Sequence, residues 1–295
     1  MSIFEYNDFV SPIIVGDDNP HNNYCIFCKN ILEKYGLNDH WEVNLKEIFD
    51  LHHLSKKYFL EEVGMDKQFW ELDLEKYSCE VWFNHCNKCG WWRIQKDISV
   101  SAKRWQIWQF FYGLAGILKK LDLSDVATPI NEISKYLLAK YESRFSLHPK
   151  LFEEVTGEVF KNIGYDVLVT GYSNDGGIDV ILEKEKKQVG IQVKRYKNEI
   201  KVNQIRELIG ALFLAGIPQG IFVTTSDFQS GAHKLIEKSL QKGISIELIN
   251  AQRFYEILSL TTQTEIDLES LKNNSKKFLQ NKLHSYNWEN PMNSL

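Results

Sequence analysis

The chain has 295 residues, of which 43% are hydrophobic and 25% are charged, and its formal net charge is −4 at pH 7. This composition is ordinary for a globular protein, and the length allows about two domains of ~150 residues. The slightly acidic balance disfavours a protein that coats DNA without sequence preference. No apolar run approaches the ~20 residues of a membrane span, and the N-terminus lacks the pattern of a signal peptide. We therefore expect a cytoplasmic protein without a membrane partner.

Four of the five cysteines form two Cys-x-x-Cys pairs. Without a secretory signal, metal ligation is favoured over disulfide bonding. Four thiolates in a tetrahedral array make a closed structural zinc site. We expect Zn²⁺ to be bound by Cys25, Cys28, Cys86 and Cys89. Cys79 is interpreted as a small buried hydrophobe, and His85 is an alternative ligand because it adjoins Cys86.

Several tryptophans surround the second cysteine pair: Trp82, Trp91, Trp92, Trp105 and Trp108. Most are expected to form a core around the metal, since a small domain needs bulky side chains. A pocket for a flipped or modified base is the alternative. Residues 1–102 are therefore predicted to form an N-terminal zinc-binding α+β module. The sequence does not decide whether this module reads DNA or binds a protein.

Two apolar patterns with spacings of three and four follow, over residues 105–114 and 130–138. This spacing predicts helices, so residues 103–147 are expected to form a helical linker. Thr128 and Pro129 suit the start of the second helix, because proline is favoured at the first helical position. His148 precedes Pro149 and marks a boundary, since the residue before proline avoids the helical conformation.

From residue 148 to residue 260 the pattern predicts one α/β domain. Helices are expected over 149–163, 202–215 and 251–259, with a further helix after Ser226, where Ser226-Asp-Phe-Gln229 resembles a capping box. Strands are expected near 165–170, 178–184, 188–195, 220–225 and 244–249. Antiparallel strands followed by strand–helix alternation predict a mixed sheet flanked by helices on both faces. Residues 261–295 are expected to form a polar C-terminal tail.

One cluster in this domain has the composition of a catalytic site. Asp179 follows a Gly-Gly turn and opens an apolar run, and Gln192 and Lys194 share one face of the next strand while Val193 points into the core. If the two strands pair as a hairpin, the carboxylate lies beside the amide and the lysine. Carboxylate and neutral oxygens suit a hard cation such as Mg²⁺, and a lysine can orient a water molecule.

Five motifs in this region occur in a fixed order. They are Pro149-Lys-Leu-Phe-Glu153, Gly164-Tyr165, Asp175-Gly-Gly-Ile-Asp179, Ile191-Gln-Val-Lys-Arg-Tyr196 and Ile221-Phe-Val-Thr-Thr-Ser226. Together they resemble the Mrr family of restriction endonucleases, within the PD-(D/E)xK nuclease superfamily. Mrr-like proteins carry Gln-x-Lys where most of the superfamily carries Glu-x-Lys. The resemblance implies a restriction-endonuclease-like fold and metal-dependent hydrolysis of DNA that leaves 5′-phosphate and 3′-hydroxyl ends.

The resemblance also assigns roles to residues. Asp179, Gln192 and the backbone carbonyl of Val193 are expected to bind Mg²⁺, and Lys194 is expected to position the attacking water. Glu153 matches the carboxylate of the first family motif, with Glu154 as the alternative. Arg195, Lys197, Gln204 and Ser226 are candidate DNA contacts within or after the locally basic segment 184–201, and Asp175 binds a second metal or caps the turn.

The leading hypothesis is a metal-dependent DNA endonuclease that acts in defence against foreign or modified DNA. The alternatives are a junction-resolving or repair nuclease, and a zinc-bearing adaptor for nucleic acid or protein with an inert nuclease fold. The expected partners are DNA, a further copy of the chain and a defence-system protein. Self-association is suggested by apolar positions in the tail, namely Ile266, Leu268 and Leu271, and by the segment 103–141.

Overall fold

The computed structural model describes residues 3–14, 23–37, 72–102, 107–170, 176–262, 267 and 269–270, with side chains left out over 7–14, 72–79, 96–102 and 107–112. The chain divides into two compact units. The C-terminal unit comprises residues 120–263 with residues 1–3, and the N-terminal unit comprises residues 4–119 with residues 264–295. Each unit is described by itself.

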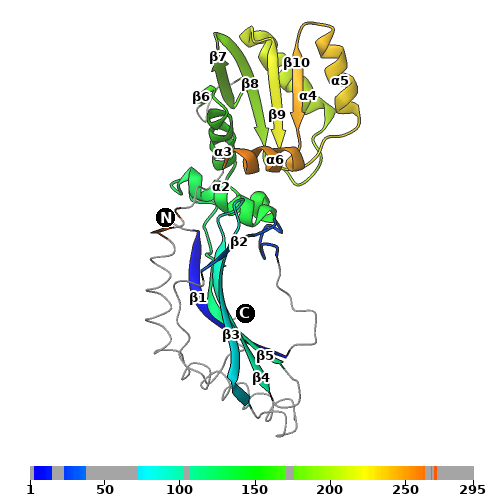
Figure 1. Ribbon diagram of the computed structural model, residues 1–295. Coiled ribbons are helices and arrows are strands. Elements are labelled where there is room, and N and C mark those ends of the chain that lie inside the picture. The colour runs from blue at the N-terminus through cyan, green and yellow to red at the C-terminus, as the bar shows by residue number, and fades with distance from the viewer. Residues whose placement is uncertain are drawn as a thin grey trace. The chain divides into compact units, whose positions relative to one another are not determined.

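The C-terminal unit is built on a mixed sheet of five strands (Figure 1). Its strands are β6 (Asp166–Val169), β7 (Val180–Lys184), β8 (Lys187–Lys194), β9 (Gln219–Thr224) and β10 (Ser245–Ile249). The spatial order is β10-β9-β8-β7-β6, with antiparallel pairing from β6 to β8 and parallel pairing from β8 to β10. The predicted mixed sheet is confirmed.

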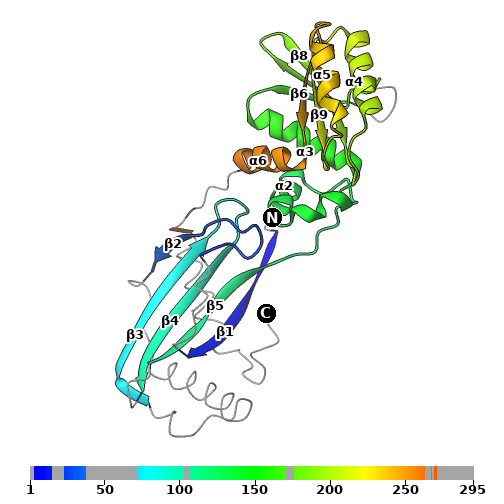
Figure 2. The same ribbon diagram turned by 90° about the vertical axis from the view of Figure 1, so that its right-hand side faces the viewer.

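Helices cover both faces of this sheet, with α3 and α6 on one side and α4 and α5 on the other (Figure 2). Their bounds are α2 (Ile130–Ala139), α3 (Pro149–Asn162), α4 (Val202–Ala215), α5 (Gly231–Leu240) and α6 (Ala251–Thr261), and a 3₁₀ turn, η3, spans Tyr141–Ser146. The backbone N–H of Lys150 donates to Nδ1 of the N-cap residue His148 (3.2 Å), which satisfies one free amide at the start of α3. Phe152 of α3 and Phe254 of α6 meet edge to face with ring centroids 5.1 Å apart, which closes the core on their side.

Two glycines let α4 lie close to the sheet. Gly190 of β8 pairs with Gly220 of β9, and both face the buried side chain of Leu212 from α4. A Cβ atom on Gly220 would lie 2.4 Å from Leu212 Cδ1, and one on Gly190 would lie 2.7 Å from Leu212 Cδ2. Leu212 belongs to the apolar core that α4 and α5 form with the sheet, which also contains Leu208 and Phe222.

The N-terminal unit contains an antiparallel sheet in the order β1-β5-β4-β3-β2. The strands are β1 (Phe4–Ile14), β2 (Glu33–Gly36), β3 (Leu72–His85), β4 (Trp92–Ala102) and β5 (Ile107–Leu118). One of its clusters of buried apolar residues comprises Leu37, Val81, Phe83 and Ile94. The described residues of this unit therefore form the β-sheet of the expected α+β module.

The helix expected over residues 105–114 is wrong, because Ile107–Leu118 forms β5. Isoleucine, tryptophan, phenylalanine and tyrosine crowd this segment, and aromatic and β-branched residues favour strands. Pairing on both sides, with β1 and β4, overrides the helical spacing. Residues 103–147 are therefore not a helical linker, because β5 belongs to the N-terminal sheet and α2 and η3 belong to the C-terminal unit. The predicted helix at 130–138 does form, as α2. The predicted apolar tail positions Ile266, Leu268 and Leu271 lie outside the described residues.

The contact between Leu212 and the glycine pair gives a stability test. Gly220→Val is expected to destabilise the C-terminal unit by about 1–3 kcal/mol, because the added methyl groups overpack a closed core. Gly210→Ala on α4 is the control, since a Cβ atom there meets nothing within 4 Å and alanine favours the helix by about 0.5–1 kcal/mol. Urea denaturation followed by far-ultraviolet circular dichroism measures both, and a Gly220→Val midpoint equal to that of the wild type would contradict the packing.

Candidate active site and metal centre

The candidate active site lies at the edge of the sheet where β7 begins and β8 ends. Val180 opens β7 and pairs with Ile191, and Lys194 closes β8 beside Thr224, the last residue of β9. The carboxyl ends of the parallel strands β8 and β9 therefore meet the start of β7 at one edge. In open α/β sheets, this is the edge at which ligands bind.

Asp179 is fixed at this edge by hydrogen bonds to β8. Its backbone N–H donates to the carbonyl of Ile191 (2.8 Å), and its Oδ2 accepts from the backbone N–H of Val193 (2.7 Å). The side chain thus extends the β7–β8 ladder by one bond, and the residue is only 7% exposed. A carboxylate that accepts from a backbone amide is held in one orientation.

Gln192 presents a buried oxygen that no described residue satisfies. The residue is 3% exposed, and its Oε1 has no hydrogen-bond partner within the described part of the chain. An unpaired buried acceptor costs about 1–3 kcal/mol, so its retention calls for an explanation such as a bound ion. The amide oxygen and the neighbouring carboxylate are the donors that a hard cation prefers, so these residues fit Mg²⁺.

Lys194 lies on the same face of β8 as Gln192, because side chains alternate along a strand. Its backbone carbonyl accepts from the N–H of Thr225 (3.2 Å) and from Oγ1 of Thr224 (3.0 Å), which fixes the end of β8 against β9. The residue is partly exposed. The amine is therefore carried by a rigid strand end but can reach solvent.

Glu153 enters the site from α3. Its side chain is 21% exposed, and its carboxylate interacts electrostatically with Asp179 and Lys194. Burial raises the pKa of Glu153, the hydrogen bond from Lys150 lowers it, the charge of Asp179 raises it further, and Lys194 lowers it. The structure thus brings the Glu153 carboxylate within electrostatic range of Asp179 and Lys194.

Two of the predicted DNA contacts lie near η3. Arg195 donates from Nη1 to the carbonyl of Phe145 (2.6 Å), while its Nε is buried without a hydrogen-bond partner in the described residues. Lys197 is exposed, and its Nζ lies 5.9 Å from the centroid of the Phe145 ring. Of these two side chains, Lys197 is the more available to an anionic ligand.

The other two predicted contacts have structural roles. Oε1 of Gln204 accepts from the backbone N–H of Lys201 (2.9 Å) and so caps the start of α4. Oγ of Ser226 donates to the carbonyl of Asn198 (2.7 Å) and joins the loops after β8 and β9. Both side chains therefore already take part in hydrogen bonds that stabilise the fold.

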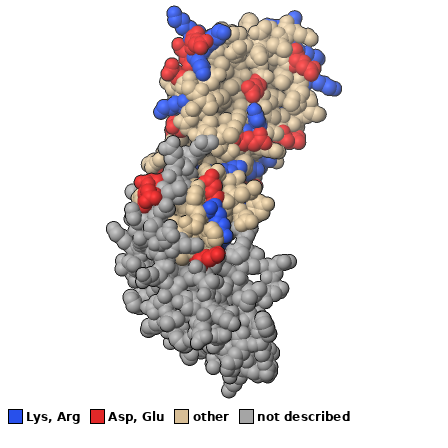
Figure 3. All heavy atoms as spheres, in the orientation of Figure 1, with Lys and Arg blue, Asp and Glu red and all other residues tan. Residues whose placement is uncertain are grey.

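The basic segment 184–201 does not form one continuous rim. Lys186 and Lys187 lie at the β7–β8 turn, at the end of the sheet opposite to Lys194. The eight residues of β8 span about 25 Å at ~3.3 Å per residue. Charged side chains of both signs gather over that far end (Figure 3). Asp175 lies outside the described residues.

An open cavity of about 330 Å³ adjoins the candidate site, beyond the ends of β9 and β10. Arg144 lines it, and the guanidinium carbon of Arg144 lies 4.1 Å from the centroid of the Phe145 ring. Nε of Arg144 donates to the carbonyl of Thr225 (3.1 Å). The cavity is also lined by Lys197, Glu199, Ser226, Asp227, Asn250, Ala251 and Gln252.

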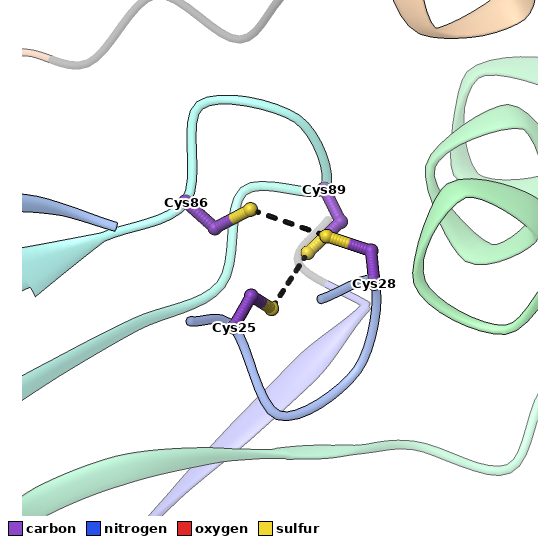
Figure 4. A group of neighbouring side chains, drawn as sticks. All are labelled: Cys25, Cys28, Cys86 and Cys89. Carbon is purple, nitrogen blue, oxygen red and sulfur yellow. Dashed lines mark hydrogen bonds between the residues drawn. The ribbon is translucent and has the colours of Figure 1, made fainter. Parts of the chain in front are cut away.

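The four predicted zinc ligands meet in the N-terminal unit (Figure 4). Their sulfur atoms lie within 4.8 Å of one another, with 3.6 Å between Cys25 and Cys89 and 3.4 Å between Cys28 and Cys86. These separations are too long for disulfide bonds, and all four are free thiols. The donor set is therefore that of a structural Zn²⁺ site.

The two cysteine loops repeat one backbone arrangement. The N–H of Lys29 donates to the carbonyl of Cys25 (3.0 Å), and the N–H of Gly90 donates to the carbonyl of Cys86 (2.9 Å). Lys29 and Gly90 both take left-handed conformations, with φ of 60° and 78°. Glycine adopts this conformation without strain, whereas lysine rarely does.

Contacts among the thiols perturb their ionisation. Hydrogen bonding among the four side chains is the main cause: it raises the pKa of Cys25 and Cys89 and lowers the pKa of Cys28 and Cys86. Metal ligation requires thiolates, and metal binding releases the remaining protons. His85 is 1% exposed and is not among the clustered ligand atoms. Burial lowers the pKa of His85.

The described tryptophans are divided between core and surface. Trp91 is buried and donates from Nε1 to the carbonyl of Gly116 (2.8 Å), as expected for a core residue. Trp92 stacks on Tyr6 with centroids 3.9 Å apart. Trp82 is partly exposed, and Lys34 Nζ lies 3.6 Å above its ring. Trp105 and the side chain of Trp108 lie outside the described residues, so the base-pocket alternative stays a prediction.

The fold and the site together define a nuclease-type α/β domain: a mixed sheet that carries a carboxylate, an amide and a lysine at one edge. Residues 145–258 match the family model Mrr_cat, described as "Restriction endonuclease". These residues form an Mrr-type restriction endonuclease domain, as the motifs from Pro149 onward predicted.

Two curated relatives and one solved structure are similar to parts of the chain. An uncharacterized protein, y4cE of Sinorhizobium fredii, is 28% identical over 45% of this chain and 37% of its own length. The type IV methyl-directed restriction enzyme EcoKMrr of Escherichia coli is 31% identical over 31% of this chain and 33% of its own length. The ATP-dependent Type ISP restriction-modification enzyme LlaBIII bound to DNA is 22% identical, with a TM-score of 0.27 over 44% of this chain and 8% of the other. The chain thus spans about a third of the length of the curated relatives it matches.

Among the described residues, no helix is both long enough and apolar enough to cross a membrane.

Sequence reasoning did not identify Lys150 as part of the site. Its Nζ contacts Glu153 Oε2 at 3.1 Å and the carbonyl of Thr170 at 2.7 Å. The sequence did carry one signal: Lys150 precedes the candidate catalytic Glu153 by three residues on a predicted helix, and side chains three residues apart on a helix are neighbours. Thr170 itself carried no such signal, because its role comes from strand pairing.

The cysteine cluster predicts one zinc ion per chain. Cys28→Ser and Cys86→Ser are each expected to lose zinc and to destabilise the N-terminal unit, because structural zinc contributes about 10–16 kcal/mol of apparent binding free energy. Cys79→Ser is the control and is expected to keep the metal. Elemental analysis of protein purified without chelators measures the content, and a wild-type chain free of zinc would refute the assignment.

Proposed function

We propose that the chain is a metal-dependent DNA endonuclease of the restriction type, acting in defence against foreign or modified DNA. The observation that carries this proposal is the unpartnered buried oxygen of Gln192 beside Asp179 and Lys194, within a domain that matches restriction endonucleases. The 31% identity to an enzyme named as methyl-directed supports modified DNA as the substrate class.

The proposed metal site is formed by Asp179, Gln192 and the backbone carbonyl of Val193. Bound Mg²⁺ supplies the polarisation of a phosphate and lowers the pKa of a water molecule. Asp179 is already oriented by its bond from the Val193 N–H, so little reorganisation is needed to use its carboxylate. The amide of Gln192 binds a cation more weakly than a carboxylate, and its burial compensates by excluding competing water.

Lys194 and Glu153 are proposed to act on the attacking water. The lysine lies on the face of β8 that carries Gln192 and can hold a water by donating a hydrogen bond. Glu153 lies on the other wall of the site and is coupled electrostatically to Lys194. The two opposite charges restrict where a water molecule and a phosphate can be accommodated together.

DNA is proposed to lie across the carboxyl ends of β8 and β9. Lys197 is exposed there, and Arg144 lines the adjoining cavity with its guanidinium against Phe145. Cationic side chains bind the DNA backbone and position it without reading sequence. Arg195 and Ser226 support this surface by holding the loops that carry it, through their bonds to Phe145 and Asn198.

The zinc module is proposed to bind the cue for cleavage, either modified DNA or a defence-system protein. The cytoplasm is the proposed compartment, because clustered free thiols suit a reducing environment.

A homodimer or larger assembly is the proposed cutting form, since cleavage of both DNA strands needs two active sites or one active site acting twice. Sedimentation with and without DNA, combined with an assay of nicking against linearisation, tests it: a monomer that linearises DNA in one binding event would refute assembly.

Two alternatives are separated from the leading proposal by substrate choice. A digestion panel of unmodified plasmid, modified phage DNA and a four-way junction, each with Mg²⁺, is the decisive assay. Preferential cleavage of the junction would favour a repair or resolving nuclease. Binding without cleavage of any substrate would favour an inert adaptor.

The site residues give the corresponding mutational test. Asp179→Asn and Lys194→Ala are each expected to reduce cleavage by about 10²–10⁴-fold, the usual scale of a lost acid–base or positioning group. Lys187→Ala is the control, because this lysine lies at the far end of β8 and is expected to leave the rate unchanged. Cleavage of the plasmid or the modified DNA by either site variant at the control rate would exclude these roles.

A further inference from the structure

The first turn of α3 carries a lysine where helices favour an acid. Lys150 is the second residue of α3, and its side chain is only 14% exposed. The partial positive charge at a helix N-terminus disfavours a cation, and burial disfavours the charged ammonium further. The helix dipole therefore does not explain a lysine at this position, and local rules of this kind are often broken at functional sites.

Lys150 connects two parts of the candidate site. Its Nζ donates to Glu153 Oε2 (3.1 Å) and to the carbonyl of Thr170 (2.7 Å). Thr170 in turn donates from its backbone N–H (3.0 Å) and from Oγ1 (2.9 Å) to the carbonyl of Asp179. A continuous chain of hydrogen bonds thus links the helix carboxylate to the backbone that carries the strand carboxylate.

We propose that Lys150 is a positioning residue for the nuclease site: it fixes the Glu153 carboxylate beside Asp179 and ties α3 to the segment that begins β7. The proposal rests on the nuclease function argued above. Lys150 acts through Glu153 rather than on the substrate, because its hydrogen bonds hold the Glu153 carboxylate and the carbonyl of Thr170. Such supporting contacts determine how closely a catalytic group is held in place.

The charges that face Glu153 determine how the proposal depends on pH. They are Lys150 on the same helix, Asp179 before β7 and Lys194 on β8. Burial raises the pKa of Glu153, and the hydrogen bond from Lys150 is the first influence that opposes it. Without Lys150, burial and Asp179 are opposed only by Lys194, so the pKa rises further. A function that needs the carboxylate is lost as the pH falls through this pKa, so its acidic limit moves to higher pH.

The matched control lies on the same helix. Lys161 pairs with Glu158 at the same spacing of three residues, with 3.7 Å between nitrogen and oxygen, but the lysine is 67% exposed and the pair lies outside the site. Lys150→Met, Lys150→Arg and Lys161→Met are compared in the full-length chain. Two quantities are measured: the cleavage rate of plasmid and modified DNA with Mg²⁺ across pH, and the titration of Glu153 by carboxyl ¹³C NMR, assigned with Glu153→Gln.

Lys150→Met is expected to lower the cleavage rate by about 10–100-fold, the usual effect of removing a group that supports an active-site ligand. It is also expected to move the Glu153 titration and the acidic limit of the rate to higher pH. Lys150→Arg is expected to restore most of both, and it keeps the test valid if the methionine variant unfolds. A wild-type titration and a rate equal to that of Lys161→Met would overturn the proposal. A wild-type chain that cleaves nothing would instead overturn the nuclease function, while the titration still reports the coupling of Lys150 to Glu153.

Discussion

The hydrogen bond from the Val193 N–H to the Asp179 carboxylate is the contact on which the candidate site depends. It uses a side chain to continue the pairing of β7 and β8 beyond the last backbone bond, so the residue proposed to bind the metal also has a structural use. A carboxylate fixed in this way needs no reorganisation to meet a cation. It also explains why Asp179 is almost fully buried at a sheet edge, where an unpaired carboxylate would be costly.

Around this contact the remaining groups come from β8, α3 and β9. β8 contributes the amide of Gln192 and the amine of Lys194 on one face. α3 contributes Glu153 from the other side, and β9 fixes the end of β8 through Thr224 and Thr225. Lys150 and Thr170 then join α3 to the start of β7. The site is therefore formed where α3, β7, β8 and β9 meet, although its central residues come from the β7–β8 hairpin.

The sequence predicted the local parts of this arrangement and missed those that depend on tertiary contacts. Period-two alternation placed Gln192 and Lys194 on one face, and cysteine spacing predicted a ligand set whose sulfur atoms do meet. Apolar spacing predicted a helix over residues 105–114, because a run rich in aromatic residues fits a helix or a strand equally well. The pairing on both sides that makes it a strand is a tertiary contact, which the sequence does not show. The capping role of Gln204 and the bond of Arg195 to Phe145 depend on where neighbouring loops fold, which residue type alone does not specify.

The β7–β8 hairpin has a consequence for how the site forms during folding. Asp179 and Val193 are 14 residues apart, so their contact closes a short loop. Lys194 and Thr224 are 30 residues apart and meet only after α4 has crossed over to deliver β9. Loop-closure entropy increases with the length of chain enclosed, and parallel pairing waits for its crossover. The carboxylate and amide pair can therefore assemble as a local unit, whereas the position of the lysine is fixed only when the parallel half of the sheet is complete.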